Sequence, residues 1–161
     1  ISVKVEVLGI GGQRCGSTWL FENLSNHQDI VASSTKEIHF FSYFYHFGFS
    51  WYHSHFQEDR DPLKRNFEFS TSYLYDSQAP YRVKKYNASM KIIVTVRNPI
   101  NRFVSHHKHE LVGLRYKDNA EMDLNTLVMN NPSYLDYGNY YFNLTDWLEH
   151  FPLSQFFIVD L

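Results

Sequence analysis

The sequence predicts an α/β fold in which helices flank a central parallel sheet. The apolar run Val3–Ile10 leads directly into a glycine-rich turn and then into a helical pattern. A strand, a glycine turn and a helix form the opening unit of such folds. A second apolar run, Lys91–Val96, is followed at once by another helix start. Two junctions from strand to helix favour a parallel sheet, because parallel strands need long crossover connections.

The first predicted helix follows the glycine-rich turn. Leu20, Phe21 and Leu24 recur at a spacing that places them on one side of a helix, and we expect this helix to end at 26–27. The apolar side would pack against the sheet and complete the first unit of the fold.

The second helix has a clearer start. Asn98 suits the N-cap and Pro99 the first helical position, so a helix is predicted from Pro99 to about Leu111. Towards the end of the chain, the pattern predicts a further helix over Tyr140–His150 and a strand over Phe156–Asp160.

Length and composition indicate one globular domain, predicted to span residues 1–161. The chain has 161 residues, of which 43% are hydrophobic and 20% charged, so it can bury a core without cross-links. Aromatic residues are in excess, with 14 Phe and 12 Tyr, and many lie in the segment Phe40–Gln57. Composition leaves open whether these rings fill the core or line a cleft for acceptors such as sugars.

Charge and residue counts exclude several classes of protein. The net charge of −2 provides no overall basic field, so no nucleic-acid partner is predicted and any anion site must be built locally. The single cysteine, Cys15, excludes an internal disulfide framework, and no apolar run is long enough for a membrane span. No metal site is predicted, because no cluster of cysteines or carboxylates accompanies the clustered histidines, which are His53, His55, His106, His107 and His109.

The glycine-rich turn has the form of an anion-binding loop. Gly11 and Gly16 are separated by four residues, and Gly16 precedes Ser17 and Thr18 at a helix start. Backbone amides and the helix dipole converge on a phosphate in such a turn. The spacing predicts a P-loop-like three-layer α/β/α domain, although Ser17 occupies the position of the P-loop lysine.

A magnesium-dependent kinase or NTPase is an alternative function for a loop of this form. Such enzymes hold Mg²⁺ with an aspartate at the end of a strand. We find no obvious aspartate of this kind, since the best candidate strand, Lys91–Val96, ends at Arg97. A cation there would repel Mg²⁺ and attract a second phosphate.

Arg97 begins a second candidate anion site. Ser105 lies two turns into the following helix, and Arg102 lies three residues before it on a neighbouring face. An arginine fork and a hydroxyl near a helix N-terminus suit a phosphate monoester such as a ribose 3′-phosphate.

These motifs together resemble a known family. The run Arg14–Thr18 resembles the loop that binds the 5′-phosphosulfate in sulfotransferases that use 3′-phosphoadenosine 5′-phosphosulfate (PAPS). Residues 97–99, with Arg102 and Ser105, resemble the 3′-phosphate motif of that family. Lys36–Phe41 resembles the segment that supplies the catalytic glutamate in the heparan sulfate branch, which includes the N-deacetylase/N-sulfotransferases.

The resemblance implies a sulfotransferase that moves a sulfonate in line from PAPS to a hydroxyl or amine of an acceptor, expected to be a carbohydrate. Glu37 would be the general base, and Arg14 would neutralise the charge that grows on the departing adenosine 3′,5′-bisphosphate. No metal is required. His39 either orients Glu37, contacts the acceptor or is a core residue. The residues implied to bind PAPS are Arg14, Cys15, Gly16, Ser17, Thr18, Arg97 and Ser105.

The chain departs from the heparan sulfate branch at two positions. Arg14 stands where that branch usually has lysine, and Phe69 stands where it has a second active-site lysine. The loop that closes over the adenine in this family would follow Leu161, so we expect a domain truncated at its C-terminal end. A non-catalytic nucleotide-binding domain of the same fold is therefore a further alternative.

The sequence leaves the compartment and the oligomeric state open. Glycosylation sequons begin at Asn23, Asn87 and Asn143 and suit a Golgi lumen. A cytoplasmic bacterial or viral enzyme is equally compatible with the sequence.

Overall fold

A computed structural model describes residues 3–57, 61, 63–113, 125, 128–129 and 132–161. Within these residues, five parallel strands form one sheet in the order β2-β3-β1-β4-β5. The strands are β1 (Val5–Gly11), β2 (Ile30–Ala32), β3 (Arg65–Phe69), β4 (Lys91–Val96) and β5 (Phe156–Asp160).

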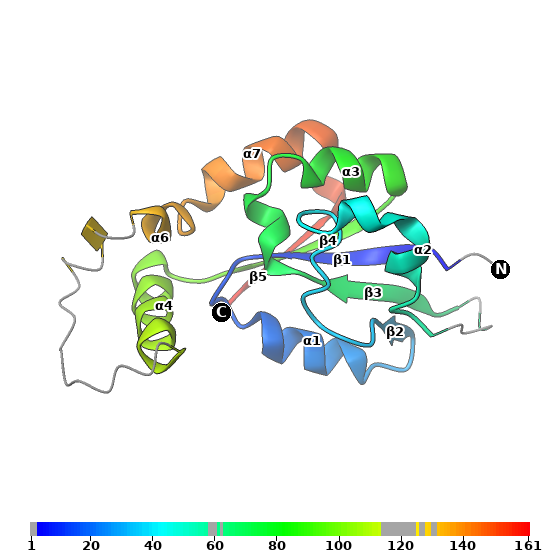
Figure 1. The fold of residues 1–161 in the computed structure, drawn as a ribbon, viewed down its shortest axis with the longest axis horizontal. Helices are drawn as coiled ribbons and strands as arrows, with labels where there is room; N and C mark the ends of the chain where they lie inside the picture. Colours follow the sequence, from blue (N-terminus) through cyan, green and yellow to red (C-terminus); the bar gives the residue numbers. More distant parts are fainter. Residues whose placement is uncertain (1–2, 58–60, 62, 114–124, 126–127, 130–131) are drawn as a thin grey trace.

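Helices cover both faces of the sheet and form the predicted three layers (Figure 1). α1 (Ser17–Ser25) lies on one face, and α3 (Ala79–Tyr86) and α7 (Tyr140–His150) lie on the other. α4 (Pro99–Gly113) and the short α6 (Ser133–Asp136) lie beyond the carboxyl end of β4. The remaining short elements are α2 (Gly48–His53) and the 3₁₀ helices η1 (Tyr45–Phe47), η2 (Thr71–Tyr75) and η3 (Leu153–Gln155). None of the helices in the described residues has the length and apolar character needed to cross a bilayer.

The strand order places β1 at a topological switch point. β1 pairs with β3 on one side and with β4 on the other. The chain reaches β2 and β3 on one side of β1 before it crosses to β4. In open α/β sheets, ligands bind outside the carboxyl ends of the strands where the order reverses in this way. The loop after β1 and the loop after β4 meet at this edge.

The α1 face of the sheet has its own small core. Leu20, Phe21 and Leu24 of α1 pack against Phe67 and Ile93 of the strands. This confirms that the three apolar residues of α1 share one side of the helix.

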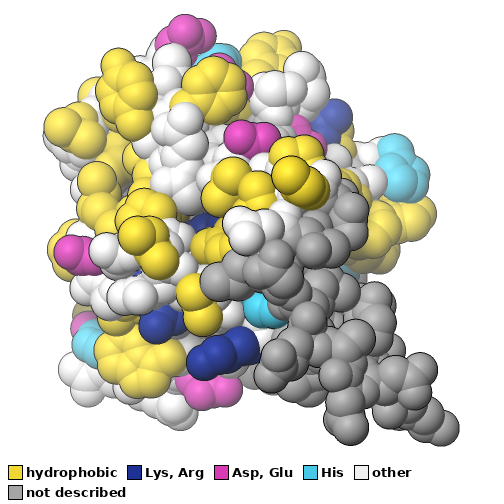
Figure 2. All heavy atoms as spheres, turned by 90° about the vertical axis from the view of Figure 1, so that its left-hand side faces the viewer, with side chains coloured by type: hydrophobic (Ala, Val, Ile, Leu, Met, Phe, Trp, Pro, Cys, Tyr) yellow, Lys and Arg dark blue, Asp and Glu magenta, His cyan; other side chains and the backbone are white. Residues whose placement is uncertain are grey.

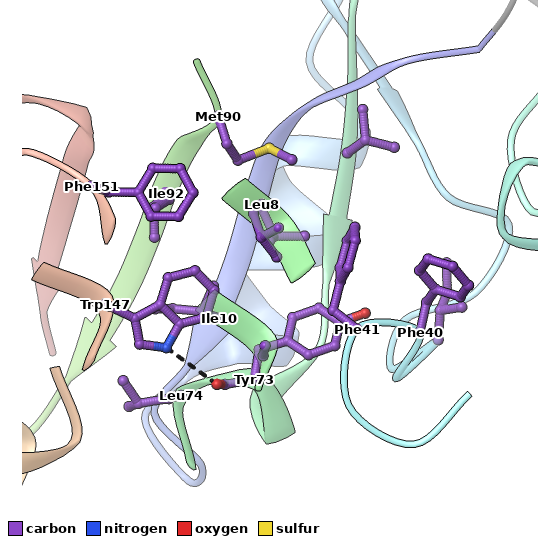
Figure 3. Packing of buried hydrophobic residues seen from close by; sticks show 14 of the residues in the cluster. Leu8, Ile10, Phe40, Phe41, Tyr73, Leu74, Met90, Ile92, Trp147 and Phe151 are labelled. Carbon is purple, nitrogen blue, oxygen red and sulfur yellow. Dashed lines mark hydrogen bonds between the residues drawn. The ribbon is translucent and has the colours of Figure 1, made fainter. Parts of the chain in front are cut away.

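A larger core lies on the opposite face (Figure 3). Leu8 and Ile10 of β1 are fully buried there with Trp147 of α7. The indole Nε1 of Trp147 donates a hydrogen bond of 3.2 Å to the backbone carbonyl of Tyr73 in η2. The bond satisfies the one polar atom of a large buried ring and joins α7 to the segment that follows β3.

Much of the aromatic excess is structural. Phe40 and Phe41 are fully buried, and Phe40 stacks on Tyr52 with 4.4 Å between ring centroids. Phe41 meets Tyr52 and Tyr73 edge to face, at 5.2 and 5.6 Å. These rings fix the segment 39–45 against β3 and η2.

Most predicted elements are confirmed. β4, α7 and β5 have the predicted bounds, whereas β1 begins two residues later than predicted and α4 ends at Gly113. Asn98 caps α4 as expected, because its Oδ1 accepts from the amides of Ile100 and Asn101 at 3.0 and 3.2 Å. The sequence does not predict β2, β3 or α3, and it gives no secondary structure for Phe40–Gln57, which contains η1 and α2.

Candidate active site

The loop after β1 presents backbone amides at the start of α1. Gly11 and Gly16 adopt positive φ angles of 146° and 68°, and a side chain at position 11 would press on Leu74 at 2.9 Å. Gly16 is the N-cap of α1, and no side chain caps this helix. The first amides of the helix therefore point outwards without a side-chain acceptor, which is the arrangement that binds anions.

The loop is tied to the end of β4. The amide of Gly12 donates to the carbonyl of Thr95 at 2.6 Å, and the Thr95 hydroxyl donates back to the Gly12 carbonyl at 3.4 Å. On its other side, the amide of Gln13 donates to the Tyr75 hydroxyl at 3.0 Å. These bonds fix where the anion-binding amides face.

Tyr140 joins the two predicted anion-binding segments. Its hydroxyl donates to the carbonyl of Arg97 at 3.0 Å and accepts from the Arg97 amide at 3.3 Å. The same hydroxyl lies 3.2 Å from the Sγ of Cys15. Burial raises the pKa of the Cys15 thiol, and its side chain is fully buried, so Cys15 faces the site only with its backbone.

One cavity, here called the Arg97 cavity, brings the two predicted anion sites together. It has a volume of about 290 Å³. The residues that line it are Arg14, Gly16, Ser17, Thr18, Arg97 and Ser105.

Arg102 does not belong to this cavity, which corrects the predicted arginine fork. Its side chain is fully buried, with Nη1 3.3 Å from the Nδ1 of His106 and Nη2 donating to the carbonyl of Tyr134. Arg102 shares the face of His106, one turn further along α4, and α6 packs on α4 and provides the Tyr134 carbonyl as an acceptor. Arg97 and Ser105 line the cavity without it.

A second cavity, here called the Glu37 cavity, adjoins the first. It also measures about 290 Å³, and it shares Arg14, Ser17 and Thr18 with the Arg97 cavity. Its remaining lining residues are Gln13, Lys36, Glu37, His39, Thr71 and His109. The predicted base therefore lies across a shared wall from the predicted nucleotide site.

Glu37 is held in a fixed orientation. Its backbone has a positive φ of 62°, and its Oε2 accepts from the amide and hydroxyl of Thr71 at 2.8 and 3.3 Å. Its Oε1 lies 2.5 Å from the Nζ of Lys36, which also lies 5.7 Å above the centre of the Phe69 ring. Lys36 was not among the predicted site residues, although its place next to Glu37 in the sequence is a signal for it.

His39 lies beside Glu37, with 3.6 Å between its Nε2 and the Oε2 of Glu37. Its Nδ1 is 2.7 Å from the hydroxyl of Ser72. Burial lowers the pKa of His39, while the carboxylate of Glu37 opposes that effect. Phe40 and Phe41 follow Glu37 closely in the sequence, but their rings lie in the core and do not line the Glu37 cavity.

A buried carboxyl group is linked by hydrogen bonds to the segment that carries Glu37 and His39. Glu68 is fully buried and accepts from the hydroxyls of Tyr52 and Tyr73 at 3.0 and 2.9 Å and from the hydroxyl of Ser70. Ser70 in turn accepts from the backbone amide of His39 at 2.9 Å. Burial raises the pKa of Glu68 to about 7, against the opposing effect of these hydrogen bonds.

The face at the carboxyl ends of the strands is shown in Figure 2. The largest patches of Lys and Arg side chains in this view lie in its lower half, on the α1 side, and hydrophobic side chains occupy much of the rest. Among the described residues, no three His, Cys, Asp or Glu side chains come together as metal ligands would.

The last predicted strand ends in an aspartate, but this strand is not a neighbour of β1. β5 ends at Asp160, which pairs with Val96 at the end of β4. β5 is thus separated from β1 by β4. The strands that flank β1 end at Phe69 and Val96, so neither places a carboxylate beside the anion-binding loop.

The fold and the adjoining cavities define a P-loop-like α/β domain with an anion-binding loop after its first strand. A family model described as "Sulfotransferase domain" matches residues 5–160. The chain therefore belongs to the sulfotransferase domain family.

Known proteins with similar sequences are sulfotransferases by name. Heparan sulfate glucosamine 3-O-sulfotransferase 5 of Mus musculus is 31% identical over 161 residues, which cover 94% of this chain and 46% of that protein. Heparan sulfate glucosamine 3-O-sulfotransferase 3B1 of Mus musculus is 31% identical over 166 residues, which cover 94% and 40%. The chain thus spans less than half the length of these relatives.

Solved structures share the fold. A sulfotransferase from Alicyclobacillus acidocaldarius matches 98% of this chain and 73% of its own, with a TM-score of 0.84 and 20% identity. A sulfotransferase domain from the curacin biosynthetic pathway matches 99% and 68%, with a TM-score of 0.62 and 17% identity. At these identities, the likeness concerns the fold alone.

The raised pKa of Glu68 predicts a pH-dependent stability. The folded state holds the Glu68 proton more tightly than the unfolded state, so this contribution to stability is full below about pH 4.5 and is lost as the pH rises to about 7. Relative to the Glu68→Gln variant, the free energy of unfolding should fall by about 3 kcal/mol over that range. Urea unfolding of both proteins at several pH values measures the difference, and parallel curves would contradict it.

Proposed function

We propose that this chain carries the donor-binding and catalytic residues of a PAPS-dependent sulfotransferase that acts on a carbohydrate. The observation that carries the proposal is the shared wall of the two cavities. Arg14, Ser17 and Thr18 line both, while Arg97 and Ser105 lie on one side and Glu37 on the other. Such a layout suits a donor with two anionic ends and an acceptor whose proton must be removed.

The residues of the Arg97 cavity fit the phosphates of PAPS. The amides from Cys15 to Thr18 would hold the 5′-phosphate, and Arg97 with Ser105 would hold the 3′-phosphate. Arg14 also fits an anion, since its Nε is buried and has no hydrogen-bond partner in the described part of the chain. A buried guanidinium N–H without an acceptor is costly, and a bound anion would satisfy it.

The residues of the Glu37 cavity fit the chemistry of transfer. When bound, PAPS supplies the sulfonate, whose bond to the bridging phosphate oxygen breaks as the acceptor oxygen or nitrogen bonds to sulfur. Glu37 takes the acceptor proton on its carboxylate. Thr71 and Lys36 hold that carboxylate in place, so its position needs no rearrangement at the moment of transfer.

Two cations lie where negative charge changes during transfer. Arg14 lines both cavities and would neutralise the charge that grows on the leaving bisphosphate. Lys36 lies in the Glu37 cavity, next to the predicted base. Of these two cations, Arg14 is the one aimed at developing negative charge, and a fixed charge in that position is among the largest contributions that enzymes make to such reactions.

A kinase or NTPase is a weaker alternative. Ser17 occupies the position of the P-loop lysine, and the strands beside β1 end without a carboxylate. Cleavage of nucleoside triphosphates usually depends on both groups. The non-catalytic alternative is opposed by the ordered contacts of Glu37, which a scaffold would have no reason to keep.

The 3′-phosphate assignment predicts selective losses in binding. Replacing Arg97 or Ser105 by Ala should weaken binding of adenosine 3′,5′-bisphosphate by about tenfold or more, because a charged hydrogen bond is worth about 1.5 to 3 kcal/mol. Binding of adenosine 5′-monophosphate should change little. Titration calorimetry measures both ligands, and Ser133→Ala, at an exposed position of α6, is the matched control. Equal losses for the two ligands would show that the 3′-phosphate binds elsewhere.

The general-base assignment predicts a loss in rate without a loss in donor binding. Glu37→Gln should lower sulfonate transfer by about 10² to 10⁴, the usual contribution of a general base, and leave donor affinity nearly unchanged. Arg14→Ala should lower both quantities. The rate is measured in single turnovers with radiolabelled PAPS, using the complete natural protein and the control Glu149→Gln, an exposed residue of α7. Undiminished transfer by Glu37→Gln would make His39 the next candidate base.

A further inference from the structure

A third cavity, here called the tyrosine cleft, opens beside the predicted base. It has a volume of about 430 Å³ and meets the Glu37 cavity at Gln13, His39 and Thr71, which line both. Its remaining lining residues are Tyr43, Ser72, Tyr75, Asp76 and Tyr137. An acceptor hydroxyl that reaches Glu37 can therefore carry the rest of its molecule in this cleft.

Aromatic rings supply the apolar surface of the tyrosine cleft. The rings of Tyr75 and Tyr137 lie 4.4 Å apart, and the Tyr75 hydroxyl accepts from the amide of Gln13 and donates to the Tyr137 carbonyl at 3.4 Å. These bonds hold the Tyr75 ring in place. Tyr43 packs on His39 with 5.3 Å between centroids and is 63% exposed. Rigid rings with polar edges suit flat, hydroxyl-bearing ligands.

Further exposed rings lie outside the cleft, in the segment that leads into η1 and in η1 itself. Tyr43, Phe44 and Phe47 form this aromatic ridge, and they are 63%, 36% and 51% exposed. Neighbouring ring centroids are 6.4 Å apart for Tyr43 and Phe44 and 5.8 Å apart for Phe44 and Phe47. Contiguous exposed apolar surface is a candidate binding surface. Its continuity with the cleft indicates a ligand longer than one ring.

The charges are divided between the cavities. The cations Arg14, Lys36 and Arg97 line the Arg97 cavity or the Glu37 cavity. The described lining of the tyrosine cleft contains no Lys or Arg and includes the carboxylate of Asp76. Burial lowers the pKa of His39, which favours its uncharged form. Arg82 is already engaged, since its Nη1 donates to the carbonyls of Phe41 and Ser42.

We propose that the acceptor is an uncharged oligosaccharide, with the reacting sugar in the tyrosine cleft and its neighbours stacked along the aromatic ridge. The inference rests on the proposed function and names the acceptor of the same site. Hydroxyl groups of such a sugar would pair with the neutral polar groups of Gln13, Thr71 and Ser72. Sulfate or carboxylate groups would instead lose water beside Asp76 without gaining a Lys or Arg among the described lining residues of the cleft.

A glycan array tests this choice of acceptor. The complete natural protein, with saturating adenosine 3′,5′-bisphosphate, is applied to an array of neutral, uronate-containing and sulfated oligosaccharides. Neutral glycans should make up the bound set. Preferential binding of anionic glycans would overturn the inference, as would binding of no glycan at all.

Variants then locate the bound glycan. Tyr43→Ala and Phe47→Ala should each weaken binding of the best neutral glycan by about tenfold, as loss of an aromatic anchor does. Tyr141→Ala removes an 85% exposed ring on α7, away from the ridge, and should have no effect. Asp76→Asn keeps the Oδ1 that accepts from the amides of Gln78 and Ala79, and it should raise binding of anionic glycans. Equal behaviour of Tyr43→Ala and Tyr141→Ala would contradict the placement.

The failure of this inference can be told apart from the failure of the proposed function. If adenosine 3′,5′-bisphosphate binds and Glu37→Gln abolishes transfer, but the preferred acceptor is anionic, only the acceptor inference is wrong. If the bisphosphate does not bind, the proposed function itself is wrong.

Discussion

The hydrogen bonds between the loop after β1 and the end of β4 determine the geometry of the whole site. The amide of Gly12 bonds to the carbonyl of Thr95, and the hydroxyl of Tyr140 bonds to both backbone groups of Arg97 while lying against the thiol of Cys15. The loop amides and Arg97 are therefore held at one edge of the sheet. Because Tyr140 comes from α7, the packing of α7 on the large core also contributes to the distance between the two anion-binding segments.

A second constraint holds the predicted base. Glu37 and His39 both have positive φ angles, which non-glycine residues adopt only when their surroundings impose them. The support comes from β3 and η2, where Ser70 links the His39 amide to the buried carboxyl of Glu68 and Thr71 binds Glu37. Strained backbone of this kind is common at functional sites. The predicted base is thus held at the end of β3, and the predicted anion-binding loop follows β1, which is the neighbour of β3 in the sheet.

The sequence could predict the parts of this arrangement that are local in the chain. Glycine spacing predicts the loop, and Asn98-Pro99 predicts the start of α4, because both depend on the backbone preferences of adjacent residues. Arg102 could not be placed in this way, since burial of its side chain depends on Tyr134 of α6, 32 residues away. For the same reason, no local pattern in the sequence predicts that Tyr140 joins two loops or that Tyr75 and Tyr137 line one cleft. The strand β2 has three residues, too few for a periodic pattern, and it is held mainly by pairing with β3.

The central claim is that the two predicted anion-binding segments form one site for a 3′,5′-bisphosphate. Thermal unfolding of the complete natural protein with different nucleotides tests this claim most directly. A ligand that binds only the folded state stabilises it by about 2.7 kcal/mol at a hundred times its Kd. Adenosine 3′,5′-bisphosphate should therefore raise the unfolding temperature without Mg²⁺, and ATP with Mg²⁺ should raise it much less. A larger rise with ATP and Mg²⁺ than with the bisphosphate would contradict the account.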